Sequence, residues 1–100
     1  MSWRVGDQQF LSRVRVISFG GLFITTPNPP EVGAVLTLLL SVPEGEIRAG
    51  GIVRNTFPDE GMGVEFTEMS EEARVRLQTL IARLMRSLQV NEVAGPSSFA

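Results

Sequence analysis

The pair Gly20-Gly21 constrains the fold most, because it lies between two runs that alternate in the manner of β-strands. Apolar and polar side chains alternate over residues 10–16 before the pair, and again over residues 22–26 after it. Glycine reaches positive φ without the steric cost of a Cβ atom, which permits a tight reversal of the chain. Ser18, just before the pair, is placed to hydrogen-bond the turn backbone. The stretch therefore predicts a β-hairpin.

Further short strands follow the same pattern. Trp3, Arg4 and Val5 are predicted to end a first strand, and later strands are predicted over residues 35–42, 46–54 and 62–67. Gly50-Gly51 predicts a bulge or sharp bend, a feature that curls sheets into barrels. The intervening stretches, 27–33 and 55–61, are rich in proline or polar residues and are predicted to be loops.

A helix is predicted from Ser70, as its N-cap, to about Gln89. Glu71 and Glu72 lie in the first turn, where negative charge suits the helix dipole. Apolar side chains recur at helical spacing along one stripe, formed by Ala73, Leu77, Leu80, Ile81, Leu84 and Leu88. This stripe is expected to pack on the sheet.

Val75 and Met85 lie off the apolar stripe and widen the apolar surface of the helix. Two interpretations stay open for them: ordinary packing on the sheet, or contact with a partner or a second copy of the chain. Residues 91–100 are small and polar, and are predicted to form a flexible tail or linker. Five or six antiparallel strands followed by one helix predict a mainly β fold, a small barrel with a C-terminal α-helix, forming one domain over residues 1–90.

The residue types that are missing exclude most catalytic chemistry. The chain has no Cys, His or Tyr, and all nine of its basic residues are Arg. Thiolate nucleophiles, imidazole bases, Schiff-base lysines and sulfur-ligated metals are therefore excluded. Asp59 and Glu60 are interpreted as solvated turn residues rather than as a catalytic pair. We predict no catalytic residue, no metal site and no cofactor.

Four arginines, Arg13, Arg15, Arg48 and Arg54, are predicted to point outward from their strands. They form either a solvated face or a surface for an anion or a partner, since a guanidinium group suits bidentate contact with carboxylate or phosphate. The net charge of −2 and the lack of an aromatic stacking platform argue against nucleic acid. No apolar run is long enough to span a bilayer and no signal peptide is visible, so we expect a cytoplasmic protein without membrane insertion.

Taken together, these features resemble the PilZ domain family over residues 10–84, most of all the PilZ-like domains of myxobacteria and related δ-proteobacteria. The resemblance rests on Ser18-x-x-Gly21, the loop from Pro30 to Gly33, the hairpin over residues 36–53 and the closing helix, together with Gly61-Met62-Gly63-Val64-x-Phe66. It implies a six-stranded barrel that serves in signalling by the bacterial second messenger cyclic di-GMP.

The family binds cyclic di-GMP through an Arg-x-x-x-Arg pair and an Asp/Asn-x-Ser-x-x-Gly turn. Ser18 and Gly21 match the turn, with Gly20 beside them, but Val16 stands at the Asp/Asn position and has no polar atom for a guanine edge. Arg4 is followed four residues later by Gln8 rather than by a second Arg. The binding motifs are degenerate, so we expect that cyclic di-GMP binding is lost.

The leading hypothesis is therefore a non-catalytic adaptor that acts through protein–protein contacts. The resemblance implies a setting in motility, type IV pili or cell polarity, with a protein of such a system as the partner. Self-association through the helix, by way of Val75 and Met85, is a further hypothesis. The alternative function is a receptor for cyclic di-GMP or another nucleotide, which would use Ser18, Gly20, Gly21 and nearby arginines.

Overall fold

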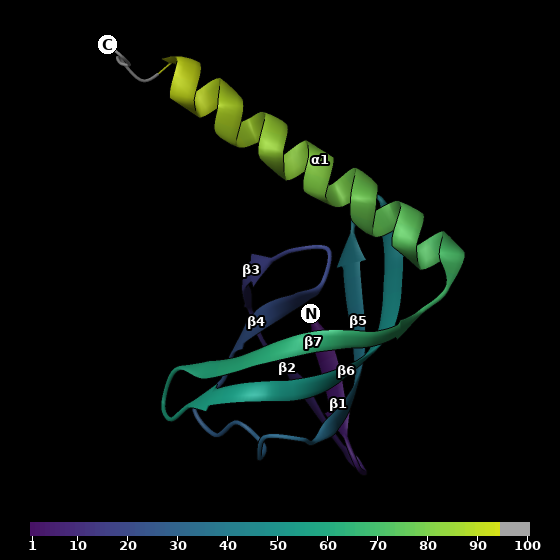
Figure 1. The fold of residues 1–100 in the computed structure, drawn as a ribbon, viewed down its shortest axis with the longest axis vertical. Helices are drawn as coiled ribbons and strands as arrows, with labels where there is room; N and C mark the ends of the chain where they lie inside the picture. The colour runs from purple at the N-terminus through teal and green to yellow at the C-terminus, as the bar shows by residue number, and fades with distance from the viewer. Residues whose placement is uncertain (95–100) are drawn as a thin grey trace.

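A computed structural model describes the backbone of residues 1–94 and the side chains of residues 1–87. The strands are β1 (Ser2–Val5), β2 (Gln8–Leu11), β3 (Val14–Ile17), β4 (Gly21–Thr25), β5 (Val35–Val42), β6 (Gly45–Phe57) and β7 (Gly61–Met69), and the helix is α1 (Glu71–Ala94). All pairings are antiparallel, in one sheet with the order β2-β1-β5-β6-β7-β4-β3. The sheet curls into an open barrel (Figure 1). The predicted mainly β fold with a C-terminal helix is confirmed.

The count of six strands is wrong by one, because the predicted strand over residues 10–16 is two strands. The chain changes pairing partners at Ser12 and Arg13. The Ser12 amide donates to the Met1 carbonyl (3.0 Å), and the Thr25 amide donates to the Arg13 carbonyl (2.9 Å). The strand before this point, β2, pairs with β1, whereas the strand after it, β3, pairs with β4. The two strands therefore form opposite edges of the sheet although they are neighbours in sequence.

The predicted loop over residues 55–61 is also too long. Residues Asn55, Thr56 and Phe57 extend β6 and pair with the start of β7. Only residues 58–60 lie between the two strands, and Asp59 has a φ of 67°. Aspartate tolerates the left-handed conformation better than most residues, so this short turn closes without a glycine at that position.

The helix is longer than predicted, since α1 continues through residues 90–94. Asn91 and Glu92 are polar, but neither residue stops a helix. The first strong stop signals in the sequence are Gly95 and Pro96. The remainder of the predicted tail, residues 95–100, lies outside the described residues.

The core lies on the inner face of the curled sheet and under the first half of α1. Trp3, Leu38, Ile47 and Met62 are almost completely buried, and the alternation predicted for the strands holds along β5, β6 and β7. Trp3 stacks on Phe10 with ring centroids 4.4 Å apart. At about 25 cal/mol per Å² of apolar surface, burial of each large side chain contributes roughly 2 kcal/mol.

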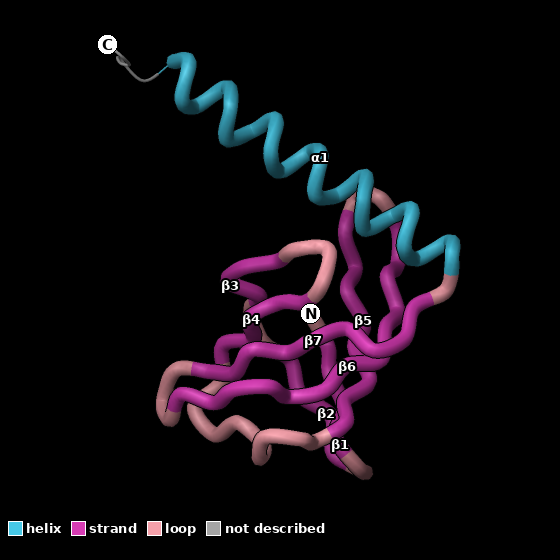
Figure 2. Tube along the Cα trace, viewed as in Figure 1, coloured by secondary structure: helices cyan, strands magenta, loops and turns pink. Residues whose placement is uncertain are grey.

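The helix docks through its first three turns. The hydroxyl of Ser70 accepts a hydrogen bond from the Ala73 amide (3.1 Å), which confirms the predicted N-cap. Four stripe residues pack into the core, namely Ala73, Leu77, Leu80 and Ile81. Beyond them α1 projects away from the sheet (Figure 2). No helix in the described part of the chain is long and apolar enough to cross a membrane.

Two arginines fasten α1 to the hairpin between β5 and β6. Arg76 donates to the carbonyl of Glu46 (2.7 Å) and pairs with Glu72 (3.1 Å), one helical turn before it. The Arg83 guanidinium forms two hydrogen bonds with the Glu44 carboxylate, at 2.6 and 3.2 Å. This bond lowers the pKa of Glu44 despite the opposing effect of desolvation, and it raises the pKa of Arg83.

A candidate binding groove beside the Ser18 turn

The turn between β3 and β4 is held by Ser18, as predicted. Its amide donates to the Gly21 carbonyl (2.8 Å), and its hydroxyl donates to the same oxygen (3.2 Å) while accepting from the Gly20 amide (3.3 Å). Phe19 stands at the tip of the turn and is 61% exposed. The serine therefore satisfies backbone groups of its own turn.

The reason for the glycine at position 21 differs from the one expected. Neither Gly20 nor Gly21 is among the glycines with positive φ. Gly21 instead lies directly against β7, where an added Cβ atom would collide with the carbonyl oxygen of Val64. A Cβ atom on Gly20 would meet nothing within 4 Å. Close backbone approach, rather than backbone conformation, requires the glycine of the Ser-x-x-Gly motif.

A groove of about 310 Å³ opens beside this turn on the outer face of the sheet. Its floor follows one row of paired residues across four strands: Val16 on β3, Phe23 on β4, Gly63 on β7 and Asn55 on β6. The Asn55 side chain lies over Gly63, since a Cβ atom there would come within 2.5 Å of its Oδ1 atom. Ser18, Gly20 and Gly21 line the end of the groove nearest the turn. The structure thus brings together Val16, Ser18, Gly20 and Gly21, the residues that the sequence singled out at the turn.

Two β-bulges place an arginine beside each end of this row. The register shifts between Val14 and Val16 on β3, so Arg15 is the extra residue there. It shifts again between Val53 and Asn55 on β6, so Arg54 is the extra residue there. Bulges redirect side chains and often occur beside binding sites. Here Arg15 directly precedes Val16 at one end of the row, and Arg54 directly precedes Asn55 at the other.

Both arginines already have partners inside the protein. The Nε atom of Arg54 lies 2.5 Å from a carboxylate oxygen of Glu65, and the Arg15 guanidinium lies 4.5 Å from the centre of the Phe23 ring. The Arg54–Glu65 pair is about half exposed, which makes it a weak and salt-sensitive interaction. Val16 is 60% exposed, so the position of the family's polar residue is an open apolar surface.

The four predicted arginines do not form one surface. Arg15 and Arg54 lie near the groove, whereas Arg48 lines separate depressions near the start of β6. Arg13 is exposed in the connection between β2 and β3. Val75 and Met85 on the helix are 55% and 54% exposed, and ten residues of helix separate them by about 15 Å along its axis.

Three groove residues, Asn55, Phe23 and Glu65, were not identified from the sequence. Asn55 falls in the stretch that the sequence predicts to be a loop, and nothing in the sequence indicates which residue of β7 it faces. The bulge in β6 determines that register, and a bulge without a glycine leaves no clear sequence signal. Among residues 1–87, no cluster of acidic side chains is suited to hold a metal ion.

Comparison with known families supports the resemblance inferred above. A family model described as PilZ domain matches residues 1–83, from the first strand to the part of α1 that packs on the sheet. Searches of curated proteins and of solved structures found no significant match.

Proposed function

Because the chain belongs to the PilZ domain family, a family of cyclic di-GMP signalling, we propose that it is a non-catalytic adaptor acting through protein–protein contacts. One observation carries the proposal: the groove beside the Ser18 turn presents exposed Val16 where the family has a polar residue. The groove's apolar surface, formed with Phe23, suits an apolar side chain of a protein. Exposed Phe19 at the turn and Phe57 on β6 add to the apolar side chains of this region.

The electrostatics of the groove support the same function. Cyclic di-GMP carries two phosphates, and the strongest contacts that a protein makes to a phosphate are charge-assisted hydrogen bonds from cations such as Arg. Of the two arginines near the groove, Arg54 is bonded to Glu65 and Arg15 is stacked on Phe23. A nucleotide would have to break the ion pair and would then meet the Glu65 carboxylate. The proposed setting remains a bacterial motility, type IV pilus or polarity system.

Calorimetric titration with cyclic di-GMP tests this proposal. We expect no binding by the wild type, and none by the Val16→Asp variant, because one restored carboxylate does not supply the missing cations. The same substitution places a charge on an apolar contact surface, so it should prevent co-purification with the protein partner. Micromolar binding that Ser18→Ala or Arg15→Ala abolishes would overturn the adaptor function.

A second function, nucleotide binding, is favoured by one observation. Arg15 and Arg54 are both bulge residues and flank the same row, an arrangement that would suit an anionic ligand if Glu65 released Arg54. The Glu65→Gln variant separates the two functions. If cyclic di-GMP binds this variant with micromolar affinity and Arg54→Gln removes that binding, the groove is a nucleotide site held closed by its own carboxylate.

A further inference from the structure

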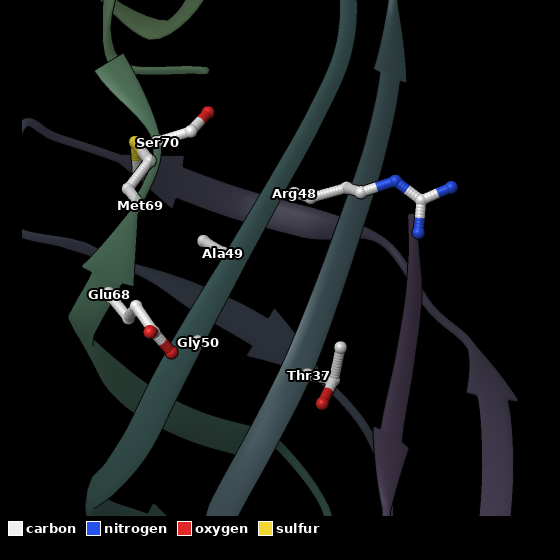
Figure 3. A pocket seen from close by; sticks show the side chains of 7 residues that line it. All are labelled: Thr37, Arg48, Ala49, Gly50, Glu68, Met69 and Ser70. Atoms are coloured by element: carbon white, nitrogen blue, oxygen red, sulfur yellow. The ribbon is translucent and has the colours of Figure 1, made fainter. Parts of the chain in front are cut away.

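A second concave surface lies away from the groove, on the outer face of β1, β5, β6 and β7. Three adjoining depressions of about 160, 520 and 240 Å³ each include Arg48 in their lining. Together they form a trough from the β1–β2 hairpin to the first turn of α1. Figure 3 shows the largest depression, with Arg48 pointing across β5 and Glu68, Met69 and Ser70 on the opposite side of β6.

One end of the trough is positively charged. Arg4 on β1 and Arg48 on β6 line the same depression, and Thr37 lies on β5, the strand between them. Among residues 1–87, the one ion pair of Arg48 is a 3.5 Å contact with Glu46, and both side chains are more than half exposed, so the pair is weak. Within residues 1–87, the Arg4 side chain has no ion pair. Two guanidinium groups are therefore available to an incoming carboxylate.

Across β6 from Arg4, the side of the trough formed by β7 carries a negative charge. Glu68 lies over Gly50 at the base of the largest depression, where a Cβ atom on the glycine would touch it at 3.4 Å. Glu72 lines the next depression, but its carboxylate is already paired with Arg76. Glu68 has no ion pair among the described residues. Its carboxylate is thus the one without an ion pair among the described acidic residues that line the trough.

The distance between Arg4 and Glu68 follows from the pairing of the strands. Arg4, Thr37, Gly50 and Glu68 occupy one row across β1, β5, β6 and β7. Three strand spacings separate its ends, which is about 14 Å, or about four residues of extended chain. Side chains four residues apart on an extended chain also point to the same side.

We propose that the trough binds an extended segment of a partner protein that carries an acidic side chain and, four residues away, a basic one. The acidic side chain meets Arg4 and Arg48, and the basic side chain meets Glu68. Charge complementarity selects this occupant over a polyanion such as nucleic acid, which Glu68 and Glu46 would repel. The trough is a different surface from the groove and does not depend on what the groove binds.

The test is an NMR titration with a synthetic peptide in which three uncharged β-branched residues separate a glutamate from an arginine. We expect amide shifts at residues 4, 37, 48 and 50, and none around Ser18. The double variant Arg4→Gln/Arg48→Gln should weaken binding roughly tenfold or more. Arg74→Gln is the matched control, since Arg74 is an exposed arginine on α1 that lines none of the three depressions.

Three results would overturn the proposal. The first is equal affinity for a peptide with glutamine in place of glutamate, which would remove the role of the arginines. The second is a set of shifts confined to the groove around Val16 and Ser18. The third is tighter binding of inorganic phosphate or a single-stranded oligonucleotide at the same amides, which would make the trough an anion site or a nucleic-acid site.

Discussion

Gly21 illustrates at the residue scale why a motif can be retained without its ligand chemistry. Its missing Cβ atom allows β4 to approach β7, and the Ser18 hydroxyl satisfies backbone groups of the turn. Both residues therefore have a structural function whether or not a nucleotide binds. Val16, by contrast, is exposed and takes no part in holding the turn, so its side chain is available for contacts outside the molecule.

The two glycines of the turn give a direct prediction. Gly21→Ala should lower the free energy of unfolding by about 3 kcal/mol, because the new methyl group forces β4 away from the Val64 carbonyl. Gly20→Ala is the matched control, since open space surrounds that position, and it should change stability by less than about 0.5 kcal/mol. Urea denaturation measures both values. Equal effects of the two substitutions would contradict the close approach.

The groove residues close to the turn in sequence could be predicted, but those contributed by neighbouring strands could not. The resemblance to the family's turn motif points to Ser18, Gly21 and Val16, and the structure places them in one groove. Asn55 and Glu65 belong to the same groove, yet they are far from the turn in sequence. Their positions depend on cross-strand register, which a bulge shifts by one residue.

At the scale of elements, the connection between α1 and the β5–β6 hairpin determines how the helix is held. The helix is attached by its buried stripe and by two arginine contacts with the hairpin. The stripe and the N-cap were predictable from helical periodicity and from Ser70. The partner of Arg83 was not, because 39 residues separate it from Glu44.

The Glu44–Arg83 bond predicts a pH dependence of stability. The pKa of Glu44 is lowered in the folded state, so its stabilising effect is fully present above the ordinary value of 4.5 and is lost as the pH falls through the lowered value. The wild type should therefore lose stability on acidification below 4.5. The Arg83→Gln variant should be less stable than the wild type at neutral pH, and acidification should lower its stability by a smaller amount.

Thermal unfolding between pH 3 and pH 7 measures this difference. Arg74→Gln is a suitable control, because Arg74 is exposed on the same helix without an ion pair among the described residues. It should follow the wild-type pH profile. A profile of Arg83→Gln parallel to that of the wild type would show that Glu44 does not couple helix docking to pH.

At the scale of the whole molecule, the order of the strands in the sheet predicts which part of the fold unfolds locally first. The centre is formed by β5, β6 and β7, which carry most of the buried strand residues. The strand at one edge, β2, has all four of its residues exposed. The open barrel was predictable from strand spacing, but its two edges were not, since the alternation runs through residues 10–16 without a break.

Native-state hydrogen exchange tests this distribution of stability. Amides in the middle of β6 and β7, such as those of Val53 and Val64, should exchange only by global unfolding. The amides of β2 should exchange at least about a hundredfold faster, because local opening of an edge strand exposes little apolar surface. Comparable protection of β2 and β6 would indicate that the edge is covered in solution, for example by a second copy.

The stacking of Trp3 on Phe10 gives the protein an intrinsic optical probe. Trp3 is the only tryptophan and the chain has no tyrosine, so emission excited at long ultraviolet wavelengths comes from one indole ring. That ring is buried and donates its Nε1–H to the Ser12 hydroxyl (3.0 Å), at the point where β2 and β3 diverge. Its strand neighbours, Ser2 and Arg4, line the trough. Fluorescence of the unlabelled protein thus reports on the N-terminal hairpin next to the proposed peptide site.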